Sequence, residues 1–425
     1  MIKLHNVNCL VAMRSMPENS IPTIITDPPY GLEFMGKEWD HGVPGKVFWE
    51  EALRVAKPGA TLMAFGGTRT YHRLACAIED AGWILRDCVF WAHGQGFPKG
   101  QNISKAIDKA AGAKREVIGA HLAPCTDSGT GRYGWNMKGS GKTQANITAP
   151  ATDLAQLWDG WNTALKPAVE PIVLAMKPLD GTFAQNAEKW GVAGLWIDGG
   201  RIGPGHNGGF GREGEASANR RYHEVGGTNM AATPGPRGGS QNGRWPANLI
   251  HDGSPEVLAC FPDSKGQLAT ASTSDTQRAG QNCYGNMRRG PNGQEPRGDS
   301  GSAARFFYCA KASKPQRNLG CDHLYWRKEG KSFVPISQSE WEFLPKSKRR
   351  QGNIHPTVKP VSLLRYLCRL TRTPTGGTVL DPFMGSGSMG VAAIEEGRDF
   401  IGMDSDVTAY ITAEARTSYA LAKEN

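Results

Sequence analysis

The chain lacks long hydrophobic runs: no stretch of about 18 consecutive apolar residues occurs in its 425 positions. The first ten residues also lack the charged start and apolar stretch of a signal peptide. The composition, 39% hydrophobic and 21% charged, is ordinary for a globular protein. We therefore expect a cytoplasmic protein without a membrane partner. Its length exceeds one typical domain, which predicts a catalytic core and an inserted or smaller second lobe.

Paired cysteines are absent as well. The 9 cysteines form no CxxC pair and follow no regular spacing, which is typical of reduced intracellular thiols. Cys309 and Cys321, with the neighbouring Asp322 and His323, offer a metal site as the alternative. Zinc sites usually carry close ligand pairs, so we expect no metal.

Periodic apolar runs nearly vanish between residues 199 and 301, where Gly, Asn, Ser, Arg and Pro dominate. Only the stretch 245–261 within this region has the composition of ordered structure. The rest is open to two interpretations, a flexible surface loop or a segment that orders on DNA. The net charge of +9 suits a polyanionic partner, although many basic proteins bind no nucleic acid.

Outside this region, short apolar runs alternate with amphipathic stretches, as in α/β proteins. The pattern predicts helices at 47–56 and 71–80 and strands at 21–26, 61–65, 83–91, 171–176 and 302–310. No internal repeat is visible.

The C-terminal part has the pattern of a βαβ unit. A short strand, 378–380, leads to Asp381; the turn Pro382-Phe383-Met384-Gly385-Ser386-Gly387 follows, then a helix at 388–396 and a strand at 399–403 that leads to Asp404. The glycines allow the backbone to approach a ligand at the helix N-terminus. Asp404 follows Asp381 by 23 positions, close to the offset of about 20 that is typical of a ribose-binding acid. This pattern predicts a site for an adenosine-containing ligand.

A second motif, Asp27-Pro28-Pro29-Tyr30, directly follows the predicted strand at 21–26. An acidic residue at the carboxyl end of such a strand lies where α/β proteins usually bind ligands. The carboxylate of Asp27 and a proline carbonyl could accept the two N–H bonds of an aromatic amine, while Tyr30 stacks on its ring. On its own the tetrapeptide would be interpreted as a tight turn; beside the C-terminal unit, it favours catalysis.

DPPY together with DPFMGSG resembles the amino-methyltransferases that modify DNA bases. HPTVKP, residues 355–360, is similar to the HPTQKP element of that family, with Val358 where Gln is usual. The order DPPY, variable region, HPTVKP and DPFMGSG is the permuted order of the β class. The resemblance covers about residues 1–178 and 245–425.

The resemblance implies a Rossmann-like α/β methyltransferase sheet, mostly parallel, with an antiparallel edge strand. It implies a catalytic half at 1–178, a partly flexible target-recognition insertion at 179–351 and a cofactor-binding half at 352–425. The implied cofactor is S-adenosylmethionine, and the implied substrate is the amino group of adenine in double-stranded DNA, with base flipping. A homodimer is implied too, and a cognate restriction enzyme stays open as a partner.

The roles of individual residues follow from the same motifs. The resemblance makes Asp27, Pro28, Pro29 and Tyr30 the catalytic, base-binding motif. It assigns the cofactor to Asn8, Cys9, Asp27, Thr357, Lys359, Asp381, Pro382, Phe383, Gly385, Ser386, Gly387 and Asp404. Asn8-Cys9 stands where the family often has Asp-Cys, and the loop Trp91 to Pro98 resembles one that helps to hold a flipped base.

The basic run Lys346, Lys348, Arg349 and Arg350 is predicted to contact DNA phosphates, with an ordinary solvated face as the alternative. Three other functions stay open. One is a protein or RNA amine methyltransferase, although such relatives typically carry Asn at the position of Asp27 and lack the permuted order; the other two concern DNA. The first is the same chemistry on the cytosine amino group, for which relatives more often carry Ser at the position of Asp27. The second is a non-catalytic DNA-binding protein of this fold.

Overall fold

The computed structural model describes residues 1–31, 42–94, 100–124, 142–203, 243–264, 301–310, 315–330, 332–355 and 358–424. The chain divides into two compact units. The larger contains Met1–Tyr30, Gly42–Gly94 and Val169–Asn425, and the smaller contains Gly31–His41 and Gln95–Ala168. Most of the segment 199–301 lies outside the described residues, so its two interpretations stay predictions.

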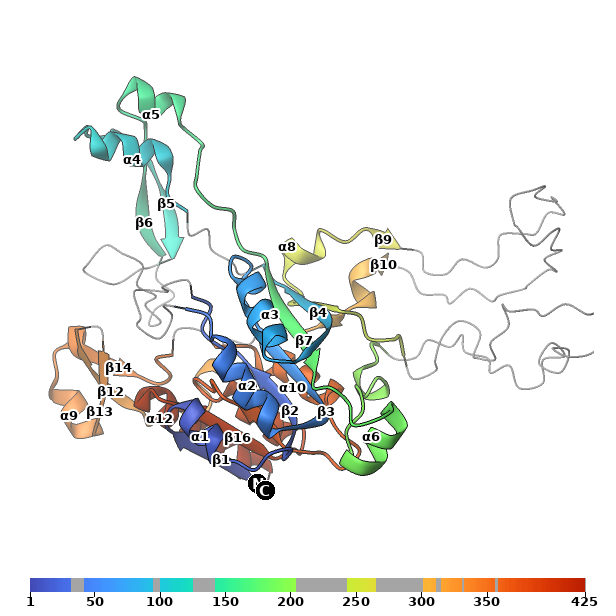
Figure 1. The fold of residues 1–425 in the computed structure, drawn as a ribbon. Helices are drawn as coiled ribbons and strands as arrows, with labels where there is room; N and C mark the ends of the chain where they lie inside the picture. Colours follow the sequence, from blue (N-terminus) through green and yellow to red (C-terminus); the bar gives the residue numbers. More distant parts are fainter. Residues whose placement is uncertain are drawn as a thin grey trace, which may run out of the picture. The chain divides into compact units, whose positions relative to one another are not determined.

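A nine-stranded sheet forms the centre of the larger unit, in the order β1-β16-β15-β2-β3-β7-β4-β8-β11 (Figure 1). Its strands are β1 (Ile2–Asn6), β16 (Phe400–Asp404), β15 (Val379–Asp381), β2 (Ile21–Thr26), β3 (Ala56–Phe65), β7 (Val169–Met176), β4 (Ile84–Ala92), β8 (Leu249–His251) and β11 (Tyr308–Cys309). All neighbouring pairs are parallel except those that β7 makes with β3 and β4. The sheet confirms the expected Rossmann-like, mostly parallel α/β class.

The resemblance had implied an antiparallel strand at an edge of the sheet. In the structure the antiparallel strand lies inside the sheet. β7 lies between β3 and β4, and the short strands β8 and β11 extend the sheet beyond β4. All six residues of β7 from Pro171 to Met176 are buried, which agrees with a central position because a strand covered on both faces is apolar throughout. Both short strands come from the segment assigned to the insertion.

Helices cover both faces of this sheet, and each face has its own hydrophobic core. One core contains buried residues of α1 (Cys9–Arg14), α2 (Lys46–Val55) and α3 (Tyr71–Asp80). The other contains those of α10 (Val361–Leu370), α11 (Ser388–Glu395) and α12 (Val407–Glu424). A short helix, α6 (Phe183–Trp190), contacts β3.

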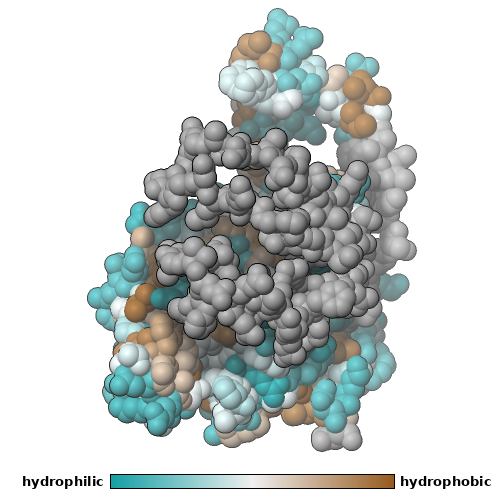
Figure 2. Space-filling model, turned by 90° about the vertical axis from the view of Figure 1, so that its right-hand side faces the viewer, coloured by the Kyte–Doolittle hydropathy of each residue, from teal (hydrophilic) through white to brown (hydrophobic). Residues whose placement is uncertain are grey.

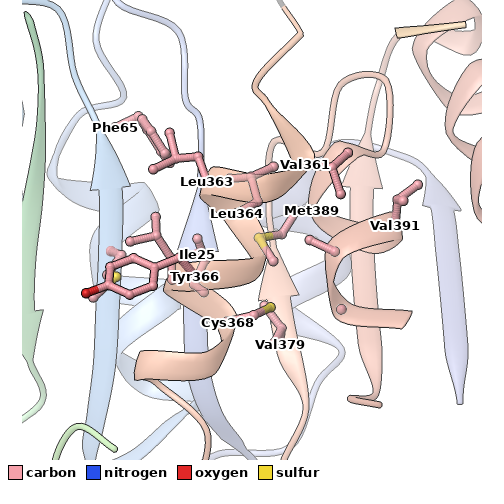
Figure 3. Close-up of a cluster of buried hydrophobic side chains, with 14 of the residues drawn as sticks. Ile25, Phe65, Val361, Leu363, Leu364, Tyr366, Cys368, Val379, Met389 and Val391 are labelled. Atoms are coloured by element: carbon pink, nitrogen blue, oxygen red, sulfur yellow. The ribbon is translucent and has the colours of Figure 1, made fainter. Parts of the chain in front are cut away.

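Helix α10 joins the two halves of the sequence in the second core. Its side chains, among them Leu363 and Leu364, lie between Phe65 of β3, Ile25 of β2 and Met389 of α11 (Figure 3). The buried Arg398 adds a polar connection: its guanidinium donates to Thr23 Oγ1 in β2 at 2.8 Å and to the Cys368 carbonyl in α10 at 2.8 Å. The strand before DPPY and the strand before DPFMGSG are therefore fixed in one core.

A small three-stranded sheet, β13-β12-β14, belongs to the same unit. It contains β12 (Tyr325–Glu329), β13 (Ser332–Ile336), β14 (Arg349–Gln351) and the helix α9 (Gln338–Phe343). Cys321, Leu324 and Trp326 form its core. The strand β8 and the helix α8 (Pro255–Leu258) agree with the order expected in 245–261. A further antiparallel pair, β9 (Asp263–Ser264) and β10 (Gly301–Ser302), lies outside that stretch.

The predicted strand at 302–310 is wrong. Ala303–Phe306 form a 3-10 turn, and only Tyr308–Cys309 join the main sheet as β11. The cause is local: the Ser302 hydroxyl accepts a hydrogen bond from the backbone N–H of Ala304 and caps the turn.

The smaller unit contains α4 (Ile103–Ala110), β5 (Val117–Pro124), β6 (Lys142–Thr148) and α5 (Asp153–Leu157). β5 and β6 form an antiparallel pair. Asp108 of α4 forms an ion pair of 2.7 Å with Arg115 and accepts a hydrogen bond from the Thr152 hydroxyl at 2.8 Å. This network ties the two helices and the hairpin together.

No described helix combines the length and the hydropathy needed to cross a membrane. Where the residues are coloured on the face in Figure 2, hydrophobic residues form separate groups among hydrophilic ones. The described cysteines are free thiols, and the described residues contain no cluster of three His, Cys, Asp or Glu that could hold a metal ion.

Candidate active site

The two motifs meet where β2 and β15 end side by side. β2 is buried along its whole length and delivers Asp27 to the carboxyl edge of the sheet. The hydroxyl of Thr26 donates a hydrogen bond of 2.6 Å to Asp381 Oδ1 at the end of β15. The acid of DPPY and the acid of DPFMGSG are thereby held on adjacent strands.

Asp27 is the centre of a compact polar cluster. Its Oδ1 accepts a hydrogen bond of 2.8 Å from the Tyr30 hydroxyl, and its Oδ2 forms an ion pair of 2.7 Å with Lys359 Nζ. Lys359 Nζ also lies 3.1 Å from the Tyr30 hydroxyl and 5.2 Å from the centre of its ring. Three residues assigned from the sequence to DPPY and HPTVKP thus form one cluster, although Lys359 contacts Asp27 rather than the glycine turn.

Glu170, which the sequence analysis did not identify, completes this cluster. It stands near the start of β7, and its Oε2 lies 3.3 Å from Lys359 Nζ and 3.4 Å from the Tyr30 hydroxyl. Its other oxygen lies 3.9 Å from Nε2 of His93, the residue directly after β4. The only sequence signal is an acid that immediately precedes a buried apolar strand.

Charge and burial fix the protonation states of Lys359 and Tyr30. Burial lowers the pKa of the Lys359 ammonium, but the charges of Asp27 and Glu170 outweigh this effect and raise the pKa overall. Burial and the same two carboxylates raise the pKa of Tyr30 well above its usual value. At neutral pH Lys359 is therefore a cation, and Tyr30 is a neutral hydrogen-bond donor.

The rest of DPPY is packed against the chain that follows β3. Pro28 is buried, Pro29 is half-buried, and the Tyr30 carbonyl accepts a hydrogen bond of 2.7 Å from the Thr70 hydroxyl. A side chain at Gly67 would approach the Tyr30 ring to 3.2 Å. The absence of a side chain at Gly67 thus leaves room for the Tyr30 ring.

The glycine turn after β15 has the predicted form. Gly385 and Gly387 have φ angles of +50° and +73°, and Gly387 is the N-cap of α11. The Asp404 carboxylate accepts a hydrogen bond of 2.9 Å from the Gly385 N–H, and Asp381 Oδ1 accepts one of 3.1 Å from the Phe383 N–H. Both predicted acids therefore hold the turn.

These two acids have perturbed pKa values. Burial, with the charges of Asp27 and Asp404, raises the pKa of Asp381 to about 7. Burial, with the charge of Asp406, raises the pKa of Asp404 to about 6. Carboxyl groups held in this way are frequent at functional sites, because a ligand can supply the hydrogen-bond donors that they lack.

Three other predicted residues of the turn have identified surroundings. Pro382 and Ser386 are buried, and the Phe383 ring lies 5.9 Å from that of Phe48. Buried Arg416 of α12 donates to the Ser386 carbonyl at 2.8 Å and to the Ser388 hydroxyl at 2.7 Å. Burial lowers the pKa of Arg416 to about 10, so it stays charged at neutral pH.

Asn8 and Cys9 lie next to this turn through the pairing of β1 with β16. The Val7 N–H donates to the Asp404 carbonyl at 3.0 Å. Asn8 is exposed and caps α1, its side chain accepting a hydrogen bond of 2.9 Å from the Leu10 N–H. Cys9 is buried, and burial raises the pKa of its thiol to about 12. Asn8 therefore has a capping role that the sequence analysis did not anticipate.

Thr357 lies outside the described residues, as do residues 95–98 of the loop assigned to base holding. His355, two residues before Thr357, lies close to the glycine turn. A Cβ atom at Gly385 would lie 3.2 Å from His355 Nε2. HPTVKP therefore reaches both Asp27 and the turn.

The predicted DNA-contacting residues belong to the small sheet. Lys346 and Lys348 are exposed in a 3-10 turn, whereas Arg349 and Arg350 are half-buried in β14. The Arg349 guanidinium donates to the carbonyls of Glu342 and Leu344 and lies 5.1 Å from the centre of the Trp341 ring. Arg349 therefore supports the small sheet, and the two lysines are the residues with accessible charge.

The comparisons with known proteins agree with this geometry. Residues 297–414, which contain HPTVKP and the glycine turn, match the family model described as DNA methylase. The chain is 35% identical over 103 residues to the type II methyltransferase M.BamHI of Bacillus amyloliquefaciens, which is 21% of this chain and 24% of that protein. It is 32% identical over 112 residues to the type II methyltransferase M.HpaI of Haemophilus parainfluenzae, which is 24% of this chain and 35% of that protein.

Among solved structures, the PvuII DNA methyltransferase, which is cytosine-N4-specific, has a TM-score of 0.42 and 12% identity, over 98% of this chain and 86% of that one. The chain spans about a quarter to a third of the length of the two type II methyltransferases. The family match and the matches to the two type II methyltransferases confirm the resemblance to amino-methyltransferases of DNA. They do not distinguish adenine from cytosine as the target.

Proposed function

We propose that this protein transfers a methyl group from S-adenosylmethionine to the exocyclic amino group of adenine in double-stranded DNA. The observation that carries the proposal is the juxtaposition of DPPY and DPFMGSG at one edge of one sheet, linked by the hydrogen bond from Thr26 to Asp381. One motif has the groups to bind an aromatic amine and the other has those to bind an adenosine. The family match over residues 297–414 supports the same chemistry.

The residues around the glycine turn fit this cofactor. Side chains at Gly385 and Gly387 would fill the turn, with the Cβ atoms 3.2 Å from His355 and 2.7 Å from Ala413. Asp404 ends the strand next to β15, where its carboxylate can accept hydrogen bonds from two ribose hydroxyls. Asp381 ends β15, which lies between the strand that ends at Asp404 and the strand that precedes Asp27.

Bound S-adenosylmethionine supplies an electrophilic methyl group. The amino nitrogen of adenine is a weak nucleophile because its lone pair is delocalised into the ring. The Asp27 carboxylate and the Pro28 carbonyl would accept its two hydrogens and draw it towards a pyramidal geometry. Asp27 also stabilises the positive charge that develops on this nitrogen before its extra proton is lost to water. Holding the two reactants in line can contribute roughly 7–11 kcal/mol at best.

The target base must leave the duplex to reach Asp27, which costs a few kcal/mol. Stacking on Tyr30 would offset part of that cost. We favour adenine over cytosine because Asp27 is the acid of the adenine-type motif, whereas relatives that act on cytosine more often carry Ser there.

The insertion at 179–351 is the proposed target-recognition region, and Lys346 and Lys348 are its proposed phosphate contacts. The smaller unit, Gly31–His41 and Gln95–Ala168, lies within the segment assigned to the catalytic half. A homodimer and a cognate restriction enzyme stay predictions.

The test is methyl transfer from labelled S-adenosylmethionine to unmethylated genomic DNA, followed by nucleoside digestion and mass spectrometry. The Asp27→Ala variant, with its cofactor affinity checked, is the matched control. N6-methyladenine from the wild type alone is the expected result. N4-methylcytosine would keep the site and change the target base, and cofactor binding without any product would favour the non-catalytic alternative.

A further inference from the structure

Glu170 occupies a position in the proposed active site that neither motif supplies. It lies in β7, opposite Trp91 of β4, and its side chain is 24% exposed. Its carboxylate is within reach of Lys359, Tyr30 and His93. These are the titratable groups that face it in the cluster, apart from Asp27.

The cluster has an uneven charge. The Lys359 ammonium lies between two carboxylates, at 2.7 Å from Asp27 and 3.3 Å from Glu170. Its side chain is only 9% exposed, so water screens these charges weakly. Among Asp27, Glu170 and Lys359, two negative charges and one positive charge leave one negative charge in excess. A single Asp27–Lys359 pair would leave none.

Each oxygen of Asp27 already accepts one hydrogen bond in this arrangement, Oδ1 from Tyr30 and Oδ2 from Lys359. An incoming amino group that binds one of these oxygens competes with the donor already there. Glu170 Oε2 already lies within reach of both donors, at 3.3 Å and 3.4 Å. Lys359 can therefore turn from Asp27 to Glu170 without losing its buried counter-ion.

We propose that Glu170 is a positioning residue for methyl transfer, which takes over Lys359 and Tyr30 as donors when the target amino group binds Asp27. By accepting these two donors, Glu170 leaves the negative charge of Asp27 next to the nitrogen on which positive charge develops. This inference rests on the proposed function. If Glu170 had only a structural role, its replacement would lower the stability of the protein and leave the rate of methyl transfer in the bound complex unchanged.

The test compares Glu170→Gln, Glu170→Asp and the exposed control Glu188→Gln of α6. Glu170→Gln keeps the shape and removes the charge. We expect it to lower kcat by roughly 10- to 100-fold, because one preorganised charge is lost, with the KM for S-adenosylmethionine within about twofold of wild type. Glu170→Asp should recover part of the rate, and Glu188→Gln should match the wild type.

A second measurement follows Lys359 itself. Acylation of its amine by acetic anhydride, quantified by mass spectrometry across a pH series, reports the pH at which it loses its proton. Without the charge of Glu170, this midpoint should move to lower pH, and it should not move in Glu188→Gln. Thermal unfolding of each variant shows whether it is folded.

The outcomes separate the two proposals. A wild type that methylates no DNA contradicts the proposed function and the role of Glu170 together. An active wild type whose Glu170→Gln variant keeps its kcat, or keeps the Lys359 midpoint, contradicts only the role of Glu170. A lower kcat with a shifted midpoint and an unchanged KM supports it.

Discussion

Lys359 Nζ lies 2.7 Å from Asp27 Oδ2, although the two residues are 332 positions apart in the chain. The contact joins the half of the sequence that carries DPPY to the half that carries HPTVKP and the glycine turn. It depends on α10, which begins directly after HPTVKP and packs between β2, β3 and α11. A permuted order of motifs therefore yields one continuous site.

Replacing Asp27 by Asn tests the proposed base acceptor with little change of shape. We expect methyl transfer to fall by at least about 100-fold, because the amide has one acceptor oxygen and no charge to stabilise the developing cation. The dissociation constant of S-adenosylmethionine, measured by calorimetry, should stay within a few-fold of wild type. The exposed Asp80→Asn of α3 is the control. Full activity in Asp27→Asn would exclude the assigned role.

The binding of S-adenosylmethionine should weaken in acid. The pKa of Asp404 is raised to about 6, so its carboxylate is ionised at pH 8 and takes up a proton as the pH falls through about 6. A protonated carboxyl accepts hydrogen bonds from ribose hydroxyls less well. We expect the dissociation constant to rise between pH 8 and pH 5, when measured by calorimetry.

Asp404→Asn provides the comparison, since its side chain has no proton to gain in this range. Its affinity should be lower at pH 8 and should depend less on pH. The pKa of Asp381, about 7, adds to the wild-type dependence in the same direction if its carboxylate also faces the ligand. A wild-type dissociation constant that is flat from pH 5 to pH 8 would contradict the ribose assignment.

Local patterns in the sequence predicted much of the fold and of this site. The helix predicted at 71–80 is α3 residue for residue, and Asp381 and Asp404 end the strands expected for them. Such features depend on residues close together in the chain. Glu170, Arg416 and the hydroxyl of Thr26 could not be found in this way, because each acts on a residue brought near by the sheet. The place of β7 between β3 and β4 likewise depends on pairing between distant strands.

The basic residues of the small sheet should differ in their contribution to DNA binding. Lys346 and Lys348 are exposed, whereas Arg349 is bound to backbone carbonyls and stacks on Trp341. We expect the double variant Lys346→Ala/Lys348→Ala to bind DNA more weakly. The slope of log K against log salt should decrease by about 2, because each phosphate contact contributes about 0.9.

Arg349→Ala serves as the contrast, since it should lower the stability of the small sheet by about 1–2 kcal/mol through lost hydrogen bonds and packing. Fluorescence anisotropy at several salt concentrations and thermal unfolding measure the two effects. An unchanged salt slope in the double lysine variant would show that these side chains form an ordinary solvated face.

Alanine substitutions at the two glycines that flank α11 distinguish the cost of backbone strain from the cost of a steric clash. Gly387 has a φ of +73° and Gly397 a φ of +63°, so alanine at either position costs about 1 kcal/mol in conformational strain. Only at Gly387 would the new Cβ meet another residue, at 2.7 Å from the buried Cβ of Ala413; at Gly397 nothing lies within 4 Å. Gly387→Ala should therefore lose a further 1–3 kcal/mol, roughly, from overpacking. Because it displaces the turn, it should also weaken cofactor binding, which Gly397→Ala should preserve. Chemical denaturation and calorimetry measure both effects, and equal losses in the two variants would mean that α12 does not constrain the turn.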